Sequence, residues 1–348
     1  MKKIGILTFH NADNLGAVLQ AYALQKTLED KCNVSAEIVD YRCDAIEKSK
    51  RVNKSAGLKN TLKSLPKSVY YKIKRKGFDS FRRKLKKSDR VYKRENVKDC
   101  NDVYDMILCG SDQIWNMECS GGDYTYFADF APAKQKKAAY AASIGEYCFS
   151  ENEAQKIREL LARFDCVSVR EASAADKLKA IGVEDVCVLS DPVALLDAKQ
   201  WKDLMKPRLY NKKYVLVYLI KNDDNVVRFA EEYAKKNNCK LINNKKSLEF
   251  ILNNSPQAFL SWVYYADCVF TNSFHGTMFS LLFEKRLAAY TENESGKVNG
   301  RVLGLLKKTG AETCVLTAEN PAGNICNVKD NIERMREQGI SYLRRICE

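Results

Sequence analysis

The sequence predicts an α/β protein in which two Rossmann-like domains face each other across a cleft. Three observations carry this prediction. Short apolar runs alternate with amphipathic segments along most of the 348 residues, which is typical of parallel sheets covered by helices. A chain of this length is expected to form about two domains. The pair Asp191–Pro192 interrupts the alternation, so the domains are predicted at 1–190 and 191–348.

The expected strands of the first half are short aliphatic runs, each followed by a polar turn. They are Lys3–Phe9, Glu37–Asp40, Asp105–Cys109, Lys137–Ala142, Cys166–Arg170 and Val186–Leu189. Apolar residues at helical spacing place a helix at Ala17–Glu29, between the first two strands. Such an alternation forms a parallel, doubly wound sheet, and ligands of these sheets bind at the carboxyl ends of the strands.

The second half repeats the pattern. Strands are expected at Tyr214–Ile220, Lys240–Ile242, Ala266–Phe270 and Arg286–Tyr290. Helices are expected at Val226–Asn237, at Pro256–Tyr265 and over Met278–Phe283. Ser273 precedes the last of these helices and is its natural N-cap. A further helix at the C-terminus could pack back on the first domain.

Composition narrows the class of protein. Apolar residues make up 45% of the chain, as in globular proteins, and no segment approaches the ~18 apolar residues of a membrane span. The apolar run at the N-terminus is too short for a signal peptide. We therefore expect a cytoplasmic protein, or one attached peripherally to the inner face of a membrane.

The thirteen cysteines do not predict a metal site. The closest pair, Cys100 and Cys109, is nine residues apart, and only His10 and His275 could add imidazole ligands. Most of the cysteines sit in apolar runs, so buried, reduced thiols are expected. The glycine-rich fingerprints of dinucleotide sites and P-loops are missing from the sequence, which disfavours NAD and P-loop chemistry.

The positive charge is concentrated in a helical insertion of the first domain, residues 48–94. It holds nineteen Lys and Arg and two acidic residues, so its net charge is +17. The net charge of the whole chain is +14, so the residues outside the insertion sum to −3. An apolar stripe of Tyr70, Ile73, Phe81 and Leu85 predicts an amphipathic helix there. An anionic membrane surface or an acidic glycan fits this helix, and nucleic acid is not expected because no nucleic-acid motif accompanies it. The alternative is a docked helix with a solvated basic face.

One of the two histidines, His275, falls in the first turn of the helix that Ser273 caps. Unpaired backbone N–H groups and the positive end of the helix dipole converge there and suit a phosphate or carboxylate. A neutral imidazole can accept a proton, and a bound anion would favour the charged, donating form. Ser273 and Gly276 belong to the same candidate anion site. The alternative is a partly buried histidine that only helps to cap the helix.

The loop His10–Gly16 follows the first strand. It offers Asp13 and Asn14 just before a helix, and Gly16 permits close approach of a ligand to the backbone. An ordinary Asx cap would have the same sequence.

Three further loops of the first domain carry candidate groups. The loop after Cys109 offers polar groups and an apolar plate suited to a sugar: Ser111, Asp112, Gln113 and Trp115. Ser143 follows the next strand. Arg170 ends the strand after that, and its planar guanidinium could hold a carboxylate or phosphate. A surface ion pair is the alternative for this arginine.

Taken together, these motifs resemble the polysaccharide pyruvyl transferase family. They occur in the family's order, from residue 4 to about 310, and so cover nearly the whole chain. They are N-x-G-A-x-L-Q-x-x-A-L from Asn14, GSDQIWN, ASIG, SVRE, the pair Asp191–Pro192, and TNSFHG followed by FSLLF.

The resemblance implies a fold like that of GT-B glycosyltransferases and phosphoenolpyruvate as donor. The implied acceptor is a sugar of a cell-surface polysaccharide, such as a capsule or exopolysaccharide, or of its precursor, soluble or lipid-linked. A catalytic histidine at His275 and an anion-binding arginine at Arg170 are implied as well. Many members carry Arg-Leu-His where this chain has Ser-Phe-His, so one donor-binding cation is missing. Lys285, Lys297 or Arg301 could replace it, and Arg301 is preferred.

Forming a pyruvate ketal requires protonation of the enol carbon, attack by one sugar hydroxyl, loss of phosphate and closure by a second hydroxyl. Groups must hold the donor's carboxylate and phosphate and move protons, but no metal or further cofactor is demanded. Asp13 or Asp112 could deprotonate the acceptor if partly desolvated. Two alternatives stay open: a nucleotide-sugar glycosyltransferase of the same architecture, and a non-catalytic glycan-binding protein.

Overall fold

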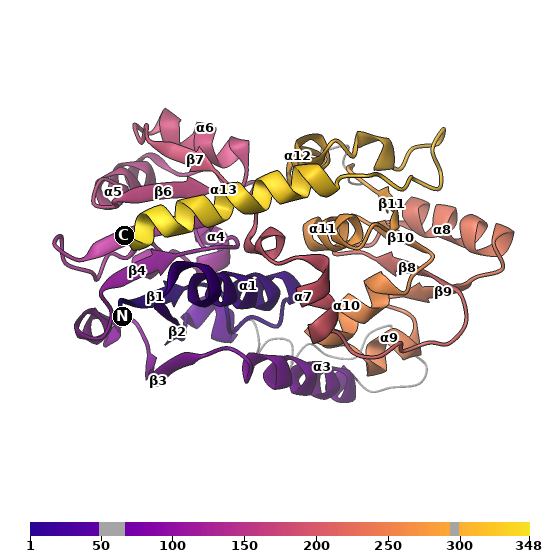
Figure 1. Cartoon of the computed structure of the whole chain (residues 1–348), viewed down its shortest axis with the longest axis horizontal. Coiled ribbons are helices and arrows are strands. Elements are labelled where there is room, and N and C mark those ends of the chain that lie inside the picture. The colour runs from indigo at the N-terminus through magenta and orange to yellow at the C-terminus, as the bar shows by residue number, and fades with distance from the viewer. Residues whose placement is uncertain (49–66, 293–298) are drawn as a thin grey trace. The chain divides into compact units, whose positions relative to one another are not determined.

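The computed structural model describes residues 1–48, 67–292 and 299–348 of the chain. These residues form two compact units (Figure 1). The chain passes from the first unit to the second after Leu196, so the division lies beyond the expected boundary at 190. Met335–Glu348, at the end of the chain, belongs to the first unit, and part of the basic insertion, up to Asp79, belongs to the second.

The first unit is built on a seven-stranded parallel sheet of order β3-β2-β1-β4-β5-β6-β7. The strands are β1 (Lys3–Leu7), β2 (Ser35–Tyr41), β3 (Lys87–Tyr92), β4 (Met106–Cys109), β5 (Lys136–Ala142), β6 (Cys166–Val169) and β7 (Val186–Val188). All six expected strands of this half are present. Strand β3 was not predicted, because an edge strand with the charged sequence KSDRVY shows no apolar alternation.

Both faces of this sheet are covered, as expected for parallel strands. Neighbouring residues of β4 enter two separate cores, Ile107 one and Leu108 the other. The helices of this unit include α1 (Leu15–Cys32), α4 (Met117–Ser120), α5 (Glu151–Leu161) and α6 (Ala172–Ala180). A short 3-10 helix, Pro192–Leu195, follows β7 at the Asp191–Pro192 pair.

The C-terminal helix α13 (Lys329–Cys347) packs on the first sheet through its second half. The hydroxyl of Tyr342 donates to the carbonyl oxygen of Ala139 in β5 at 2.8 Å. Gly339 lets the helix approach the sheet, because a Cβ there would lie 2.4 Å from the hydroxyl oxygen of Tyr140.

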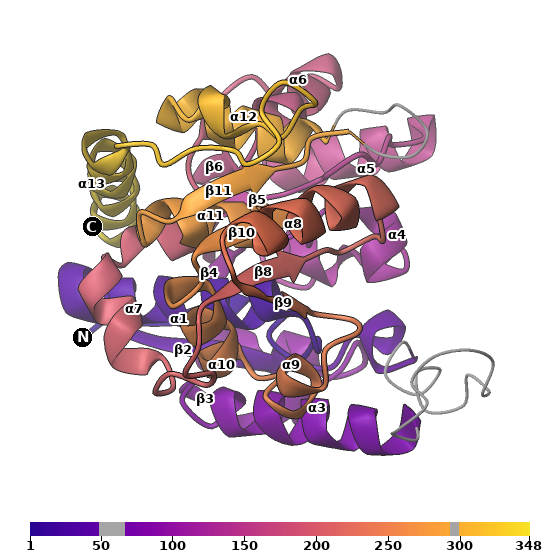
Figure 2. The same cartoon turned by 90° about the vertical axis from the view of Figure 1, so that its right-hand side faces the viewer.

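The second unit has a four-stranded parallel sheet of order β11-β10-β8-β9, which can be followed in Figure 2. Its strands are β8 (Tyr214–Tyr218), β9 (Lys240–Asn243), β10 (Cys268–Thr271) and β11 (Arg286–Ala289). Its helices are α7 (Ala198–Leu204), α8 (Asp224–Lys236), α9 (Leu248–Leu252), α10 (Pro256–Tyr264), α11 (Phe274–Leu282) and α12 (Gly300–Thr309). Each strand and helix expected in this half is present, which confirms the α/β class.

The basic insertion contains the amphipathic helix α3 (Lys67–Arg82), and residues 49–66 of the insertion lie outside the described residues. The apolar side of this helix is covered by protein near its C-terminal end. Phe78 and Phe81 are fully buried, and the ring of Phe81 lies 5.7 Å from that of Tyr22. Leu85, expected to extend the stripe, lies beyond the end of the helix. Tyr70 and Ile73 are half-buried, so protein covers this stripe only in part.

In the described part of the chain, no helix combines the length and apolar character needed to cross a membrane.

Candidate functional site

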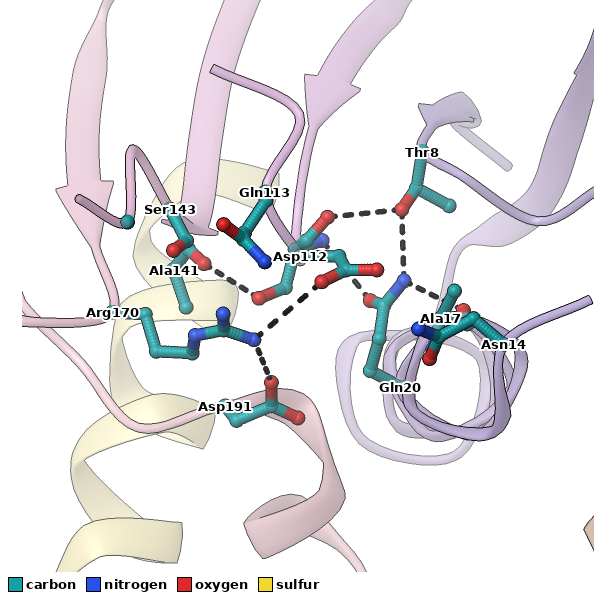
Figure 3. A network of polar contacts seen from close by, with 12 residues as sticks. Thr8, Asn14, Ala17, Gln20, Asp112, Gln113, Ala141, Ser143, Arg170 and Asp191 are labelled. Carbon is teal, nitrogen blue, oxygen red and sulfur yellow. Dashed lines mark hydrogen bonds and ion pairs between the residues drawn. The ribbon is translucent and has the colours of Figure 1, made fainter. Parts of the chain in front are cut away.

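Polar side chains gather at the carboxyl edge of the first sheet, where β4, β5 and β6 end (Figure 3). Asp112 follows β4, Ser143 follows β5 and Arg170 follows β6. Asn14 and Gln20, from the start of α1, lie at the same edge in Figure 3. The first unit thus brings together four of the loops that the sequence singled out.

Arg170 is the centre of a buried ion cluster. Its Nη1 lies 2.7 Å from Oδ2 of Asp191 and 3.9 Å from Oδ1 of Asp112, and its Nε lies 3.5 Å from Oε2 of Glu171. Burial by itself would lower the pKa of Arg170, but the three carboxylates outweigh it and raise the pKa. A surface ion pair is the wrong description, because the side chain is only 2% exposed. These contacts favour a role for Arg170 in orienting Asp112. They are less compatible with a guanidinium that is free to bind an anion of the substrate.

Asp112 has an unusual backbone. Its φ of 73° lies in the left-handed region that favours glycine. The carbonyl oxygen of Asp112 accepts hydrogen bonds from the backbone N of Ile114 at 2.8 Å and of Ser143 at 2.9 Å, which hold this conformation. Non-glycine residues held in this way concentrate at functional sites. Of the two candidate carboxylates, Asp112 therefore has the stronger structural signature.

Gln20 joins two loops of the site, although it was not predicted as a site residue and entered only as part of a motif. Its Nε2 donates to Oγ1 of Thr8 and to the carbonyl of Ala17, both at 2.8 Å, and its Oε1 accepts from the backbone N of Ser111 at 3.1 Å. Ser111 is fully buried, and its hydroxyl donates to the carbonyl of Ala141 at 2.5 Å. The expectation that Ser111 contacts the acceptor is therefore wrong, because this hydroxyl supports the loop from beneath.

Glu171 organises the loop after β5 and was also missed as a site residue. One carboxylate oxygen accepts from the hydroxyl of Ser143 at 2.7 Å and from the backbone N of Ile144 and Gly145 at 3.2 and 3.1 Å. Ser143 is itself buried, so it serves the loop rather than an acceptor. Gly145 has a φ of 60°, and a Cβ there would lie 2.4 Å from Oε1 of Gln113. Gln113 is half-buried and remains a candidate for acceptor binding.

Trp115 belongs to the core, contrary to the expectation of an apolar plate for a sugar. The side chain is fully buried, and its Nε1 donates to the carbonyl of Tyr126 at 2.9 Å. Its ring stacks on that of Phe127, with centroids 5.2 Å apart. The motif GSDQIWN gave no sign of which side of the chain faces the core.

Arg82, at the end of α3, fixes the loop after β1. Its guanidinium donates to the carbonyls of His10, Asn11 and Ala12 at 3.3, 3.0 and 2.7 Å, and its Nη2 lies 2.6 Å from Oδ1 of Asp13. The side chain of Asp13 is 20% exposed, so it can still meet a ligand. Arg82 is buried, so it is not one of the cations that could touch a membrane.

Asn14 and Gly16 begin α1. The side chain of Asn14 accepts from the backbone N of Ala17 at 3.2 Å, so the Asx cap is confirmed. Asn14 is exposed and remains a candidate for acceptor binding, whereas Gly16 is buried in the first turn of the helix.

In the second unit, His275 lies in the first turn of α11, and Ser273 is confirmed as the N-cap. The Oγ of Ser273 accepts from the backbone N of Gly276 at 3.2 Å, and the backbone N of Ser273 donates to Oγ1 of Thr271 at 3.0 Å. A Cβ on Gly276 would lie 2.5 Å from Oγ1 of Thr271, so glycine lets the helix start this close to β10. His275 is half-buried at this edge. The field of the helix N-terminus makes the place suitable for an anion.

A second helix N-terminus is tied to the first. The cap of α12, Asn299, accepts from the backbone N of Val302 at 3.4 Å, and its Nδ2 donates to the carbonyl of Asn272 at 3.0 Å. Asn272 directly precedes the cap of α11. Arg301 lies in the first turn of α12, so it remains the preferred candidate for the missing cation.

Lys285 does not belong to this site. It lies beyond the C-terminal end of α11 and directly before β11. The first residue of β11, Arg286, pairs with Cys268 at the start of β10, whereas His275 follows the end of β10. The structure thus corrects the expectation that Lys285 binds the donor. Lys297, the third candidate, lies outside the described residues.

A metal centre was not expected, and the described residues contain no group of three or more His, Cys, Asp or Glu side chains that could hold a metal ion.

Solved structures with similar folds are enzymes of nucleotide sugars. A putative UDP-N-acetylglucosamine 2-epimerase from Listeria monocytogenes has a TM-score of 0.50 at 12% identity, over 100% of this chain and 91% of that chain. The UDP-GlcNAc 2-epimerase from Neisseria meningitidis bound to UDP-GlcNAc has a TM-score of 0.47 at 12% identity, over 100% and 94% of the two chains. An alpha-glucosyltransferase in complex with UDP has a TM-score of 0.46 at 9% identity, over 100% and 94%. At these identities the similarity concerns the fold alone, which is GT-B-like.

A comparison with family models identifies the family of this chain, whereas a comparison with individual curated proteins finds no match. The family model for polysaccharide pyruvyl transferase matches residues 14–293, which is most of the chain. The chain belongs to the polysaccharide pyruvyl transferase family.

Proposed function

We propose that this chain transfers the pyruvate unit of phosphoenolpyruvate onto a sugar of a cell-surface polysaccharide or of its precursor, forming a ketal and releasing phosphate. The observation that carries the proposal is the position of His275 in the capped first turn of α11, in a chain of this family. A proton-transfer group and an anion-binding helix end coincide there, as the chemistry of this donor requires.

The second unit supplies the donor site in this proposal. Backbone N–H groups at the start of α11, together with Arg301 at the start of α12, hold the carboxylate and phosphate of phosphoenolpyruvate. Gly276 contributes to this site by letting the first turn of α11 lie close to β10. The bound anion favours protonated His275, which then gives its proton to the enol carbon or to the departing phosphate.

The first unit supplies the acceptor site. Its carboxyl edge carries carboxylates and amides. Carboxylates accept hydrogen bonds from sugar hydroxyls, and amides both accept hydrogen bonds from them and donate to them. Of the two candidate bases we prefer Asp112. Asp13 already makes a short ion pair of 2.6 Å with Arg82, whereas the nearest guanidinium nitrogen of Arg170 lies 3.9 Å from Asp112. Oδ1 of Asp13 is therefore already occupied by a hydrogen bond from Arg82.

In this mechanism, one sugar hydroxyl attacks the carbon that bears the phosphate, and a second hydroxyl closes the ring. The bond from that carbon to the phosphate oxygen breaks. One of the two hydroxyl protons replaces the proton given to the enol carbon, and the other leaves with phosphate. The product is a cyclic ketal, and no electrons are exchanged with any other compound.

The test is incubation of the purified chain with phosphoenolpyruvate and a panel of soluble and lipid-linked glycans. We expect release of inorganic phosphate, together with a glycan whose mass has increased by that of pyruvate less water. Nucleotide sugars form a second arm of the experiment. Release of nucleotide instead of phosphate would identify a glycosyltransferase, and glycan binding without turnover would identify a binding protein.

A further inference from the structure

Two cysteines of the second unit are in direct contact. The Sγ atoms of Cys314 and Cys326 lie 2.7 Å apart, and the hydroxyl of Thr313 lies 3.2 Å from Sγ of Cys326. Cys314 is buried, whereas Cys326 is partly exposed. We propose that this pair is a modification site, at which the two thiols form a reversible disulfide by exchange with a small-molecule disulfide such as oxidised glutathione.

The contact is held by the backbone around it. The segment that carries both cysteines runs along β11, an edge strand of the second sheet. Asn324 exchanges both backbone hydrogen bonds with Leu287 of β11, at 2.8 and 3.0 Å, and the backbone N of Leu316 donates to the carbonyl of Ala289 at 2.9 Å. The thiol of Cys314 donates to the carbonyl of Asn324 at 3.5 Å. The two sulfur atoms therefore meet through fixed main-chain positions, and little rearrangement is needed for a bond.

The difference in exposure indicates which of the two thiols reacts first with the small disulfide. The thiolate of Cys326, which solvent reaches, attacks one sulfur of the small disulfide and releases the first small thiol. The hydroxyl of Thr313 is placed to donate to that thiolate. Cys314 then attacks Sγ of Cys326 and releases the second small thiol. The protein pair loses two electrons and two protons, and the small disulfide is reduced to two thiols.

The burial of Cys314 fits the second step. Burial and the neighbouring thiol raise the pKa of Cys314, so it would react slowly with a reagent from solvent. Its contact with Cys326 removes that obstacle once the mixed disulfide has formed, because the two sulfur atoms are already adjacent. The neighbour thus turns an inert buried thiol into a resolving one.

The bond would close a short loop over an edge strand. It would hold the segment between the two cysteines beside β11. An edge strand has unpaired backbone N–H and C=O groups, which such a segment protects from pairing with another chain. A crosslink of this kind limits the freedom of the unfolded chain. We therefore expect the oxidised protein to melt several degrees higher than the reduced one, and to resist proteolysis between residues 314 and 326.

The test treats the full chain with oxidised glutathione, blocks remaining thiols, and maps disulfides by mass spectrometry of peptides. We expect a linked pair of peptides containing Cys314 and Cys326, which dithiothreitol separates. Cys314→Ser should leave a stable glutathione adduct on Cys326, because the resolving thiol is gone. Cys148→Ser, which removes an exposed thiol of the first unit, serves as control and should leave the link unchanged.

Peptide mapping also separates this site from the other free thiols of the chain, such as Cys32 and Cys347 in the first unit. Three results would overturn the proposal: both thiols of the pair remain free, the glutathione adduct on Cys326 persists in the wild-type chain, or Cys314→Ser fails to accumulate the adduct. Circular dichroism of each variant shows that the comparison is made between folded proteins.

Discussion

Replacing Arg170 by methionine should destabilise the first unit strongly. The substitution keeps much of the volume of the side chain but removes a positive charge that opposes Asp191, whose side chain is 1% exposed and lies 2.7 Å from the guanidinium. Removing one partner of a buried ion pair costs about 3–5 kcal/mol, because the other charge is left uncompensated. Asp112 and Glu171, at 3.9 and 3.5 Å, lose the same cation.

Urea unfolding followed by circular dichroism measures this loss. Arg94→Met is the matched control, because Arg94 pairs with Asp129 but is 56% exposed, so solvent screening limits the loss to under about 1 kcal/mol. If both variants lose the same stability, or if Arg170→Met is as stable as the wild type, the description of the cluster is wrong.

A second substitution separates the two roles of Arg170. Arg170→Lys keeps a positive charge but cannot span Asp112 and Asp191 with one planar group. If Arg170 acts by orienting Asp112, kcat should fall while KM for phosphoenolpyruvate stays nearly constant. A raised KM with unchanged kcat would instead indicate that Arg170 binds phosphoenolpyruvate.

Three further outcomes are expected. Arg82→Met should lower the free energy of unfolding by about 2–4 kcal/mol, because three carbonyls and a carboxylate lose their donor; a loss below about 1 kcal/mol in urea would mean that the loop after β1 holds itself. Gly276→Ala should cost about 1–3 kcal/mol by overpacking, whereas Gly304→Ala on α12, where a Cβ meets nothing within 4 Å, should be neutral or slightly stabilising; equal melting temperatures would contradict this. We propose that the exposed cations of α3 attract an anionic membrane by charge alone, so Lys72→Gln with Lys76→Gln should weaken sedimentation with anionic vesicles by about 1 kcal/mol per residue; equal binding to neutral vesicles would refute it.

Periodicity and capping rules predicted much of the fold. The strands of the first sheet other than β3, and all four of the second, came from apolar runs bounded by turns. Ser273 as the cap and His275 in the first turn followed from the same local rules. These features depend on neighbours in sequence, so the sequence alone carries them.

The rest depended on contacts distant in sequence. The burial of Arg82 was not predicted, because its partners, the carbonyls of residues 10–12, lie about seventy positions away. Trp115 was placed at the site because its motif does not say which way the indole points, and the structure turns it into the core. Lys285 was chosen for its charge, without regard to the end of α11 at which it lies.

The central claim is that His275 moves protons in a reaction of phosphoenolpyruvate. The most direct measurement compares phosphate release and ketal formation by the wild type, His275→Ala and, as control, Lys285→Ala at the opposite end of α11. We predict that His275→Ala loses about 10²–10⁴-fold in turnover, that its melting temperature stays close to that of the wild type, and that Lys285→Ala keeps full activity. A His275→Ala variant that retains more than about a tenth of wild-type turnover would contradict the account.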